Sequence, residues 1–175
     1  MILVKKNTIH SFLYGSALYI LLCFFTCNKG CAQQLTELQV YVIQGLSFGT
    51  FSAGSQGGTV TISPDGNRTV SGTIIPLAGS TGSCAILEIE APPNRLIHIE
   101  FPKSVQFKGS KKGKGITISN FKSDKPNNSF ITTVNNLPYR NIVRVGATLT
   151  VQNPAENISD DYVGEFHFMV NYIQQ

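Results

Sequence analysis

Two carboxylates stand close together in the sequence, at Glu88 and Glu90. In an extended strand, residues two apart share one face, so these carboxylates would lie roughly 7 Å apart, a separation that a glycoside hydrolase uses. Such catalysis requires one carboxyl in an apolar pocket that raises its pKa, whereas alternate positions on one outward face have the same aqueous surroundings. We therefore interpret the pair as a solvated strand face rather than as an acid and a base.

The thiol and imidazole side chains of Cys84, His98 and His167 show none of the spacings that are typical of metal ligands. Both histidines occupy polar positions of alternating stretches, which indicates surface residues. Cys84 begins the apolar run 84–87, and free cysteine is among the most buried residue types, so we expect a small buried side chain. The sequence predicts no catalytic residue, no metal site and no cofactor, and we expect that the chain is not an enzyme.

Four lysines crowd one glycine-rich stretch, at Lys108, Lys111, Lys112 and Lys114. The stretch lacks the spacing of a phosphate-binding loop, and Gly115 stands where that loop has Ser or Thr. A run of like charges is usually a solvated surface feature, so we expect a flexible hairpin tip. The alternative that stays open is a polar contact with acidic glycans, lipid headgroups or an acidic partner, which salt would weaken.

The first 32 residues have the pattern of a secretory signal peptide. Two early lysines precede the apolar stretch 12–25, and small residues lead to a cleavage position after Ala32. The apolar stretch is too short for an ordinary membrane-spanning helix, which needs roughly 20 residues. An uncleaved anchor and a lipid attached at Cys27 or Cys31 are the alternatives. We expect a domain of residues 33–175 that is secreted or lies in the cell envelope, in the periplasm or on the surface.

Cleavage would also change the charge and the cysteine content of the mature chain. Three lysines leave with the signal peptide, which lowers the formal net charge from +4 to +1. The basic composition therefore indicates no attraction to nucleic acid. Cys84 would be the one cysteine left, so no disulfide within the mature chain is expected.

Apolar and polar residues alternate in short stretches from residue 38 onward, and Gly, Pro, Asn and Asp separate these stretches. This two-residue period is typical of antiparallel strands with one face on a core and the other in water. We predict strands at 38–42, 59–62, 68–75, 85–91, 97–101, 116–118, 143–151 and 166–172. The sequence predicts one all-β domain of seven to nine strands without an amphipathic helix, an immunoglobulin-like or Greek-key β-sandwich.

Three details of this sandwich follow from the turns and the alternation. Leu38, Val40 and Val42 share one side of the first strand. The turn Pro64-Asp65-Gly66-Asn67 is expected to join a hairpin, because glycine accepts the positive φ of a tight turn. The strands on either side of Pro92-Pro93-Asn94 are expected to pair with each other.

An ordered set of phrases resembles a bacterial secreted family known as domain of unknown function 4402. The phrases are Leu46-Ser-Phe-Gly-Thr-Phe-Ser-Ala-Gly54, residues 57–66, residues 68–72, Ile116-Thr-Ile-Ser-Asn-Phe121, residues 145–151 and residues 162–172. The resemblance implies an exported β-sandwich of pilin-like or adhesin-like type, with no established catalytic residues. The lysine-rich tip and Cys84 depart from the family pattern.

Two functions are consistent with these observations. The first is a non-catalytic structural or adhesive surface protein, because the ending from Gly164 to Tyr172 resembles the last strand of fimbrial subunits. Residues 38–42 could then pair with the sheet edge of another copy or another surface subunit, although pairing inside their own sheet is favoured. The alternative is a monomeric module that binds a carbohydrate or a protein; the chain has no Trp to stack on a sugar, but Tyr41 and Tyr139 are candidates for exposed aromatics. Contact with a membrane is expected only through the signal peptide or a lipid anchor.

Overall fold

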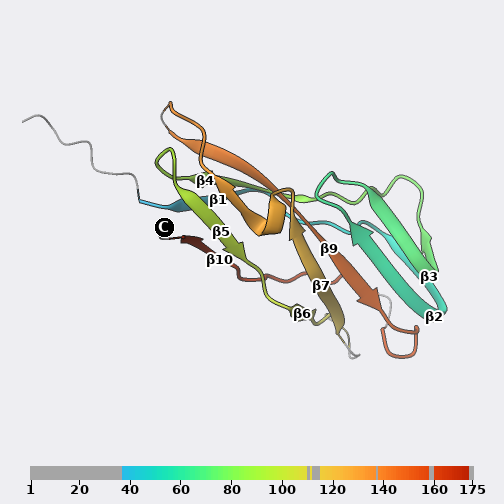
Figure 1. Ribbon diagram of the computed structural model, residues 1–175. Helices are drawn as coiled ribbons and strands as arrows, with labels where there is room; N and C mark the ends of the chain where they lie inside the picture. Colours follow the sequence, from blue (N-terminus) through green and yellow to red (C-terminus); the bar gives the residue numbers. More distant parts are fainter. Residues whose placement is uncertain (1–36, 110, 112–114, 137, 158–159, 174–175) are drawn as a thin grey trace, which may run out of the picture. The chain divides into compact units, whose positions relative to one another are not determined.

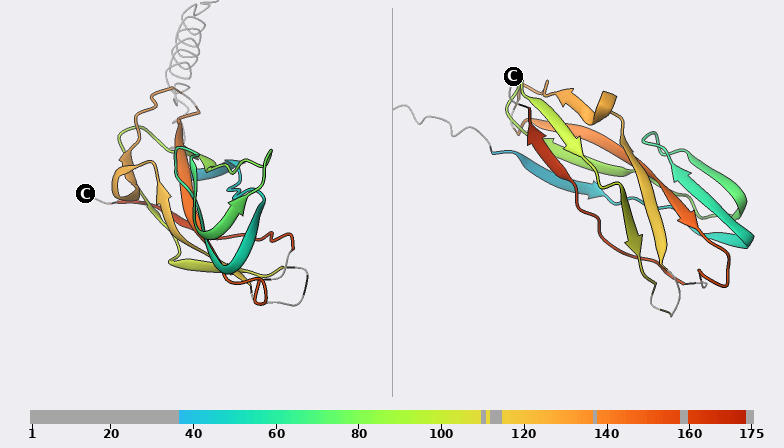
Figure 2. Two further views of the ribbon diagram at one scale, coloured as in Figure 1. Left: turned by 90° about the vertical axis from the view of Figure 1, so that its right-hand side faces the viewer. Right: turned by 60° about the horizontal axis from the view of Figure 1, so that its bottom comes forward.

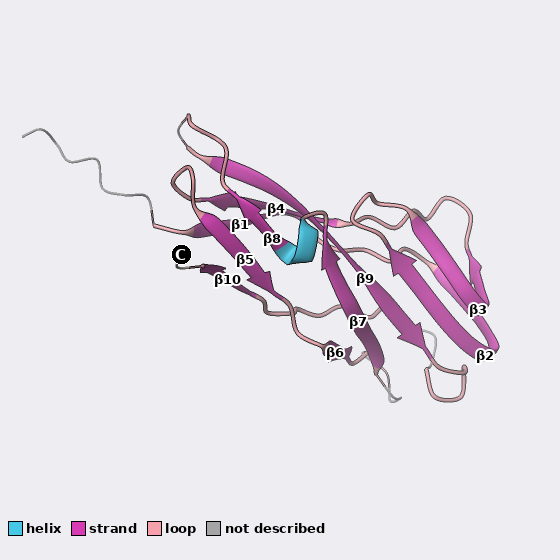
Figure 3. Ribbon diagram, viewed as in Figure 1, coloured by secondary structure: helices cyan, strands magenta, loops and turns pink. Residues whose placement is uncertain are grey.

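Ten strands and one short 3-10 turn form in the part of the chain that the structure describes (Figures 1 and 3). A computed structural model describes residues 37–109, 111, 115–136, 138–157 and 160–173. The elements are β1 (Gln39–Gln44), β2 (Phe51–Ile62), β3 (Arg68–Pro76), β4 (Ala85–Glu90), β5 (Leu96–Glu100), β6 (Ser104–Phe107), β7 (Ile116–Ser123), η1 (Pro126–Asn128), β8 (Ser129–Ile131), β9 (Arg140–Val151) and β10 (Met169–Tyr172).

The signal peptide predicted at residues 1–32 lies outside the described residues, as do its cleavage position and both candidate lipid-bearing cysteines. The described residues lie within one compact unit, Thr36–Gln175. In this part of the chain, no helix has the length and apolar character needed to cross a membrane.

The strands form two antiparallel sheets. The larger sheet has seven strands, with the order β1-β4-β9-β2-β3; β7 also pairs with β9, and β6 pairs with β7. The smaller sheet has the order β10-β5-β8. The prediction of an all-β antiparallel fold is therefore confirmed, but the predicted seven to nine strands are too few. The short strands β6 and β8 had been missed because four and three residues are too few to display a clear alternation.

Strand β9 connects the part of the larger sheet that contains β1 and β4 to the part that contains β2 and β3. Its first half pairs with β4 from Arg140 to Val145, and its second half pairs with β2 from Ala147 to Val151. Gly146 stands where the partner changes, and a Cβ atom at this position would lie 2.2 Å from the carbonyl oxygen of Ile62. Only glycine therefore lets the end of β2 approach β9 this closely.

Buried alternate residues hold the two sheets together. One cluster joins β4, β9 and β5, where Leu87, Ile89, Ile97, Ile99 and Val143 are almost fully buried. Fully burying such a side chain stabilises the fold by about 1.5–3 kcal/mol. A second cluster contains buried residues of β2, β7 and β9, with the rings of Phe101, Phe107 and Phe166 packed at its margin.

The turn at Pro92-Pro93-Asn94 joins the two sheets instead of making a hairpin. β4 pairs with β1 and β9, whereas β5 pairs with β10 and β8, so the predicted pairing of these two stretches is wrong. Ile89 and Ile97 belong to the same buried cluster, so the two strands face each other across the core. In both strands the alternate residues that the sequence indicates are the buried ones. This alternation does not reveal whether two strands are neighbours in one sheet or lie opposite each other in two sheets.

The hairpin at Pro64–Asn67 is confirmed. β2 and β3 pair antiparallel from Ile62 opposite Arg68, and Gly66 has a φ of +83°. The N–H of Ser63 donates to the carbonyl of Asn67 at 2.9 Å, which closes the turn. Beyond the hairpin, residues 77–83 form a loop that leads to β4.

The last strand is shorter than predicted. β10 covers only Met169–Tyr172, because Phe166 and Phe168 leave the ladder and pack as aromatic rings against the core. The ring centroid of Phe166 lies 4.8 Å from that of Phe121, and that of Phe168 lies 6.0 Å from that of Phe101. Alternation alone does not distinguish a strand from an extended segment that inserts every second side chain.

Hydrogen bonds from Thr132 stabilise the turn that joins the two sheets. Its side chain is fully buried; the hydroxyl donates to the carbonyl of Pro92 at 2.6 Å and accepts from the N–H of Arg95 at 2.9 Å. The N–H of Asn94 donates to the carbonyl of Thr132 at 2.8 Å. One buried hydroxyl therefore satisfies a carbonyl and an amide of a turn whose two prolines have no N–H.

We expect Thr132→Val to lower the free energy of unfolding by about 2 kcal/mol, because the isosteric side chain leaves a carbonyl and an amide without a partner. The measurement is urea unfolding of residues 33–175, monitored by circular dichroism. The matched control is Thr133→Val at the neighbouring exposed position, for which no change is expected. Equal effects of the two substitutions would contradict the role assigned to the hydroxyl.

Candidate functional site

Strand β1 is exposed along its whole length. All six residues of Gln39–Gln44 are exposed, with Val42 at 65% and Ile43 at 57% of their full exposure. Leu38 packs against the buried cluster, whereas Val40 and Val42, which the alternation places on the same side of the strand, are exposed. β1 is the edge of the larger sheet, so none of the described strands pairs with one side of its backbone.

The attachment of β1 relies on its backbone ladder with β4, which confirms that this stretch pairs inside its own sheet. The ladder runs from Gln39 opposite Glu90 to Gln44 opposite Ile86, with an irregularity after Val42. The side-chain amide of Gln44 donates to the carbonyl of Cys84 at 2.8 Å. Because no residue of β1 belongs to either buried cluster, the strand adds little to the core that stabilises the domain.

Strand β10 is the matching edge of the smaller sheet. β8 is the other edge of the smaller sheet, and in the right-hand view of Figure 2 β10 (red) and β1 (blue) run along the same margin of the sandwich. Val170 of β10 and Leu38 next to β1 pack against the same buried cluster. Met169 is 57% exposed, and Tyr172 and Ile173 are exposed as well.

We call β1 together with residues 169–173 the open side. Among the described residues, seven of the thirteen large hydrophobic side chains that are exposed belong to it: Val40, Tyr41, Val42, Ile43, Met169, Tyr172 and Ile173. Proteins usually protect sheet edges with lysine, proline, bulges or very short strands. Neither β1 nor β10 contains a charged residue or a proline; β1 has an irregularity after Val42, and β10 has four residues. The other edges are protected: β3 ends in Pro76, β6 lies between Lys103 and Lys108, and β8 has only three residues.

Glu88 and Glu90 form a structural ion pair with one arginine. Arg140 donates to Glu88 Oε2 at 3.0 Å, and its Nε lies 3.5 Å from Glu90 Oε2. Burial by itself would lower the pKa of Arg140, but attraction to Glu88 and hydrogen bonds with both carboxylates raise it above its ordinary value. The same guanidinium lies 4.8 Å from the ring centroid of Tyr41, so this network also holds the exposed face of β1.

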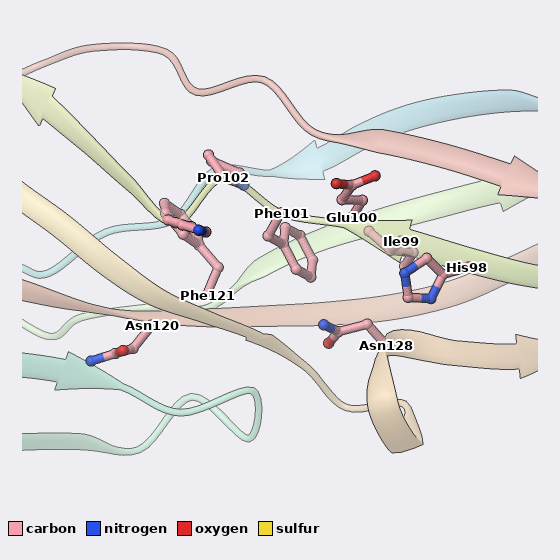
Figure 4. A pocket seen from close by; sticks show the side chains of 9 residues that line it. His98, Ile99, Glu100, Phe101, Pro102, Asn120, Phe121 and Asn128 are labelled. Carbon is pink, nitrogen blue, oxygen red and sulfur yellow. The ribbon is translucent and has the colours of Figure 1, made fainter.

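A hollow of about 500 Å³ lies between β5 and β7 (Figure 4). His98 Nδ1 lies 2.9 Å from Ser129 Oγ, and this hydroxyl donates to the carbonyl of Asn127 at 3.2 Å. When this hydroxyl donates to Asn127, it accepts from a protonated Nδ1 and gives the imidazole no proton, which is the reverse of an activated nucleophile. Glu100 points away from the Asn128 amide, so these polar groups do not converge on one point.

The remaining predicted residues form no reactive centre in the described part of the chain. Cys84 is buried, as expected, and His167 is exposed. Across the described residues, no three side chains of His, Cys, Asp or Glu come together as metal ligands.

The lysine-rich tip is described only in part. Lys108 is exposed, Lys111 donates its backbone N–H to Asp160 Oδ2 at 2.7 Å, and Lys112 and Lys114 lie outside the described residues. A Cβ atom at Gly109 would lie 2.4 Å from the Asp160 carboxylate, so this acidic group sits against the tip. The polar or anionic contact predicted for these lysines stays a prediction.

Sequence reasoning missed the two-sided exposure of β1. The alternation places Leu38, Val40 and Val42 on one side of the strand, but the intervening Tyr41 and Ile43 are also apolar. A strand with large apolar residues at both parities and no charge is the signal that could have pointed to this exposed edge.

Comparison with known proteins identifies a family. The family model described as Domain of unknown function (DUF4402) matches residues 38–172. No curated protein and no solved structure matches the chain.

We expect the amides of β1 that bond to β4 to exchange with deuterium at least about 100-fold faster than the amides of β4 that bond to β9, because few buried contacts resist local opening of β1. Hydrogen exchange of residues 33–175, followed by NMR, measures both sets in one sample. Equal protection of the two sets would show that β1 is an integral part of the stable core.

Proposed function

This chain belongs to the family described as Domain of unknown function (DUF4402), and from that premise we propose that it is a non-catalytic, exported structural or adhesive subunit of the bacterial cell surface. In this proposal the protein is fimbrial-like: it joins other copies, or other surface subunits, by adding a strand at the open side. The domain is immunoglobulin-like in this proposal, and its signal peptide carries it out of the cytosol.

The observation that carries the proposal is that two edge strands with exposed apolar residues and with neither charge nor proline lie on one side of the molecule. Strand addition would pair the free backbone groups of β1 and cover its exposed side chains on both faces. Such an edge would promote aggregation in a protein that works alone, because it accepts any extended chain. For a subunit that assembles, the same edge is a binding surface.

The arrangement of the two edges favours a chain of subunits over a closed dimer. Pairing β1 of one copy with β1 of another would make an isologous contact that ends at two copies. Pairing β1 of one copy with β10 of the next would leave one free edge at each end, so that further copies can add. Polymers require this second mode.

A monomeric module that binds a carbohydrate or a protein is the second candidate. The observation that favours it is the set of uncharged Ser and Thr side chains that lie opposite one another on β2, β9 and β7 of the larger sheet. Tyr41, one of the two candidate aromatics, is exposed but lies beneath the Arg140 guanidinium.

We expect Val42→Lys to abolish self-association of residues 33–175, because a charge on an edge strand cannot be desolvated when a second strand pairs there. The measurement is size-exclusion chromatography with light scattering, together with electron microscopy of the native cell surface. The matched control is Ile142→Lys, which adds the same charge at a 51% exposed position of the central strand β9 and should leave assembly intact. A wild-type chain that stays monomeric at high concentration, with no filaments on native cells, would refute the proposal.

Deletion of residues 33–43 tests whether β1 itself is donated to a neighbour. Because no residue of β1 belongs to either buried cluster, we expect the shortened chain to remain folded and to lose its polymers. Circular dichroism reports the fold, and light scattering reports the assembly. An unfolded monomer would contradict donation, since a strand that its own domain requires cannot be given to another copy.

A further inference from the structure

The outward face of the larger sheet carries two rows of hydroxyl groups across five neighbouring strands, β3, β2, β9, β7 and β6. The pairing registers place residues of these strands directly opposite one another. The first row is Ser71, Thr59, Thr150, Thr117 and Gln106; the second row is Thr69, Thr61, Thr148, Ser119 and Ser104. We call these ten positions the hydroxyl face.

The composition of the hydroxyl face is unusual for this chain. Ser and Thr make up about one residue in six of the whole sequence, yet they occupy every position of the face except Gln106. Threonine is common in strands. This preference does not explain the pattern, because the outward positions on the other half of the same sheet are charged or apolar, as at Glu88, Arg140 and Ile142.

The fold holds these hydroxyls in a fixed array. The alternate residues Val60, Ile118 and Leu149 are buried, which directs their neighbours to the opposite face. Thr61 Oγ1 and Thr148 Oγ1 lie 3.1 Å apart across the β2–β9 pair. One such bond uses only part of the capacity of a hydroxyl, which has one donor and two acceptor sites.

A hollow of about 490 Å³ lies at one end of the face, where Thr59 and Thr150 form part of its wall. The exposed amides of Gln56 and Gln152 also line it, as does the carboxylate of Glu156. A volume of this size is within the ordinary range for a small-molecule site. The face therefore continues into a recess whose side chains both donate and accept hydrogen bonds.

We propose that the hydroxyl face binds a neutral polysaccharide chain. Sugar hydroxyls donate and accept hydrogen bonds, as do the Ser, Thr, Gln and Asn side chains of the face and its recess. The γ-methyl groups of the threonines supply small apolar contacts for the C–H faces of sugar rings, in a chain that has no Trp. Because none of the ten positions is charged, the face offers no cation to the carboxylates or sulfates of an acidic glycan.

The geometry favours one flexible chain over a crystalline surface. Neighbouring strands lie about 4.8 Å apart and outward residues of one strand about 6.7 Å apart, so the ten positions form a regular grid. A twist of about 20° per strand turns the face by about 80° over five strands, so it cannot match a planar lattice. The proposal does not depend on assembly at the open side, which lies on other strands.

Affinity electrophoresis of residues 33–175 tests the proposal, with laminarin, dextran, mannan and galactan as neutral probes and alginate as the acidic probe. We expect retardation by at least one neutral polysaccharide. Thr59→Val with Thr150→Val should weaken this binding by about tenfold, since two hydroxyls are lost while valine keeps the shape and strand preference. The matched control is Thr81→Val in an exposed loop, which should bind as the wild type does.

No retardation by any neutral probe would overturn the proposal, and so would retardation by alginate alone or unchanged binding of the double variant. If the double variant does not fold, NMR titration of the wild-type chain decides the question. Shifts confined to the threonine methyls of the hydroxyl face support the proposal, and shifts elsewhere refute it. The Val42→Lys chain should keep the glycan affinity of the wild type, so a failure of assembly and a failure of glycan binding are distinguishable.

Discussion

The change of partners along β9 is the constraint on which the rest of the structure depends. At Gly146 the strand stops pairing with β4 and begins pairing with β2, and the close carbonyl of Ile62 leaves no room for a side chain there. Its buried residues Val143 and Leu149 anchor one core cluster each. The larger sheet is thereby divided into two halves. Both halves pair with β9, but they carry different side chains on their outward faces.

The two halves place different chemistry at their margins. The half built on β4 ends at β1, whose exposed apolar residues and free backbone suit the addition of another strand. The half built on β2 and β7 presents the hydroxyl face. Its inner strands pair on both sides, and its two edge strands carry a proline or have lysines next to them. Assembly and recognition can therefore coexist in one copy, because neither surface uses the strands of the other. A surface subunit that both polymerises and adheres needs this separation.

Local features of the fold could be predicted from the sequence, whereas long-range ones could not. Alternation from Ala85 to Glu90 and the Asp-Gly turn after β2 identify their elements directly, because both depend on neighbours in the chain. The sheet to which β5 belongs depends on contacts with β8 and β10, which no local pattern contains. The same limit applies to the candidate surfaces. The hydroxyl face exists only in the registers of five strands, and the exposure of β1 follows from the absence of a neighbour.

Interchain crosslinking tests the central claim, strand addition at the open side, most directly. One chain would carry Val42→Cys in β1 and a second chain Asn171→Cys in β10, while the native Cys84 stays buried in both. The account predicts that oxidation of the mixed chains yields a β1–β10 disulfide between two copies, and that Ile142→Cys in place of Val42→Cys yields none. Equal crosslinking of the two pairs, or no crosslinking of either, would contradict it.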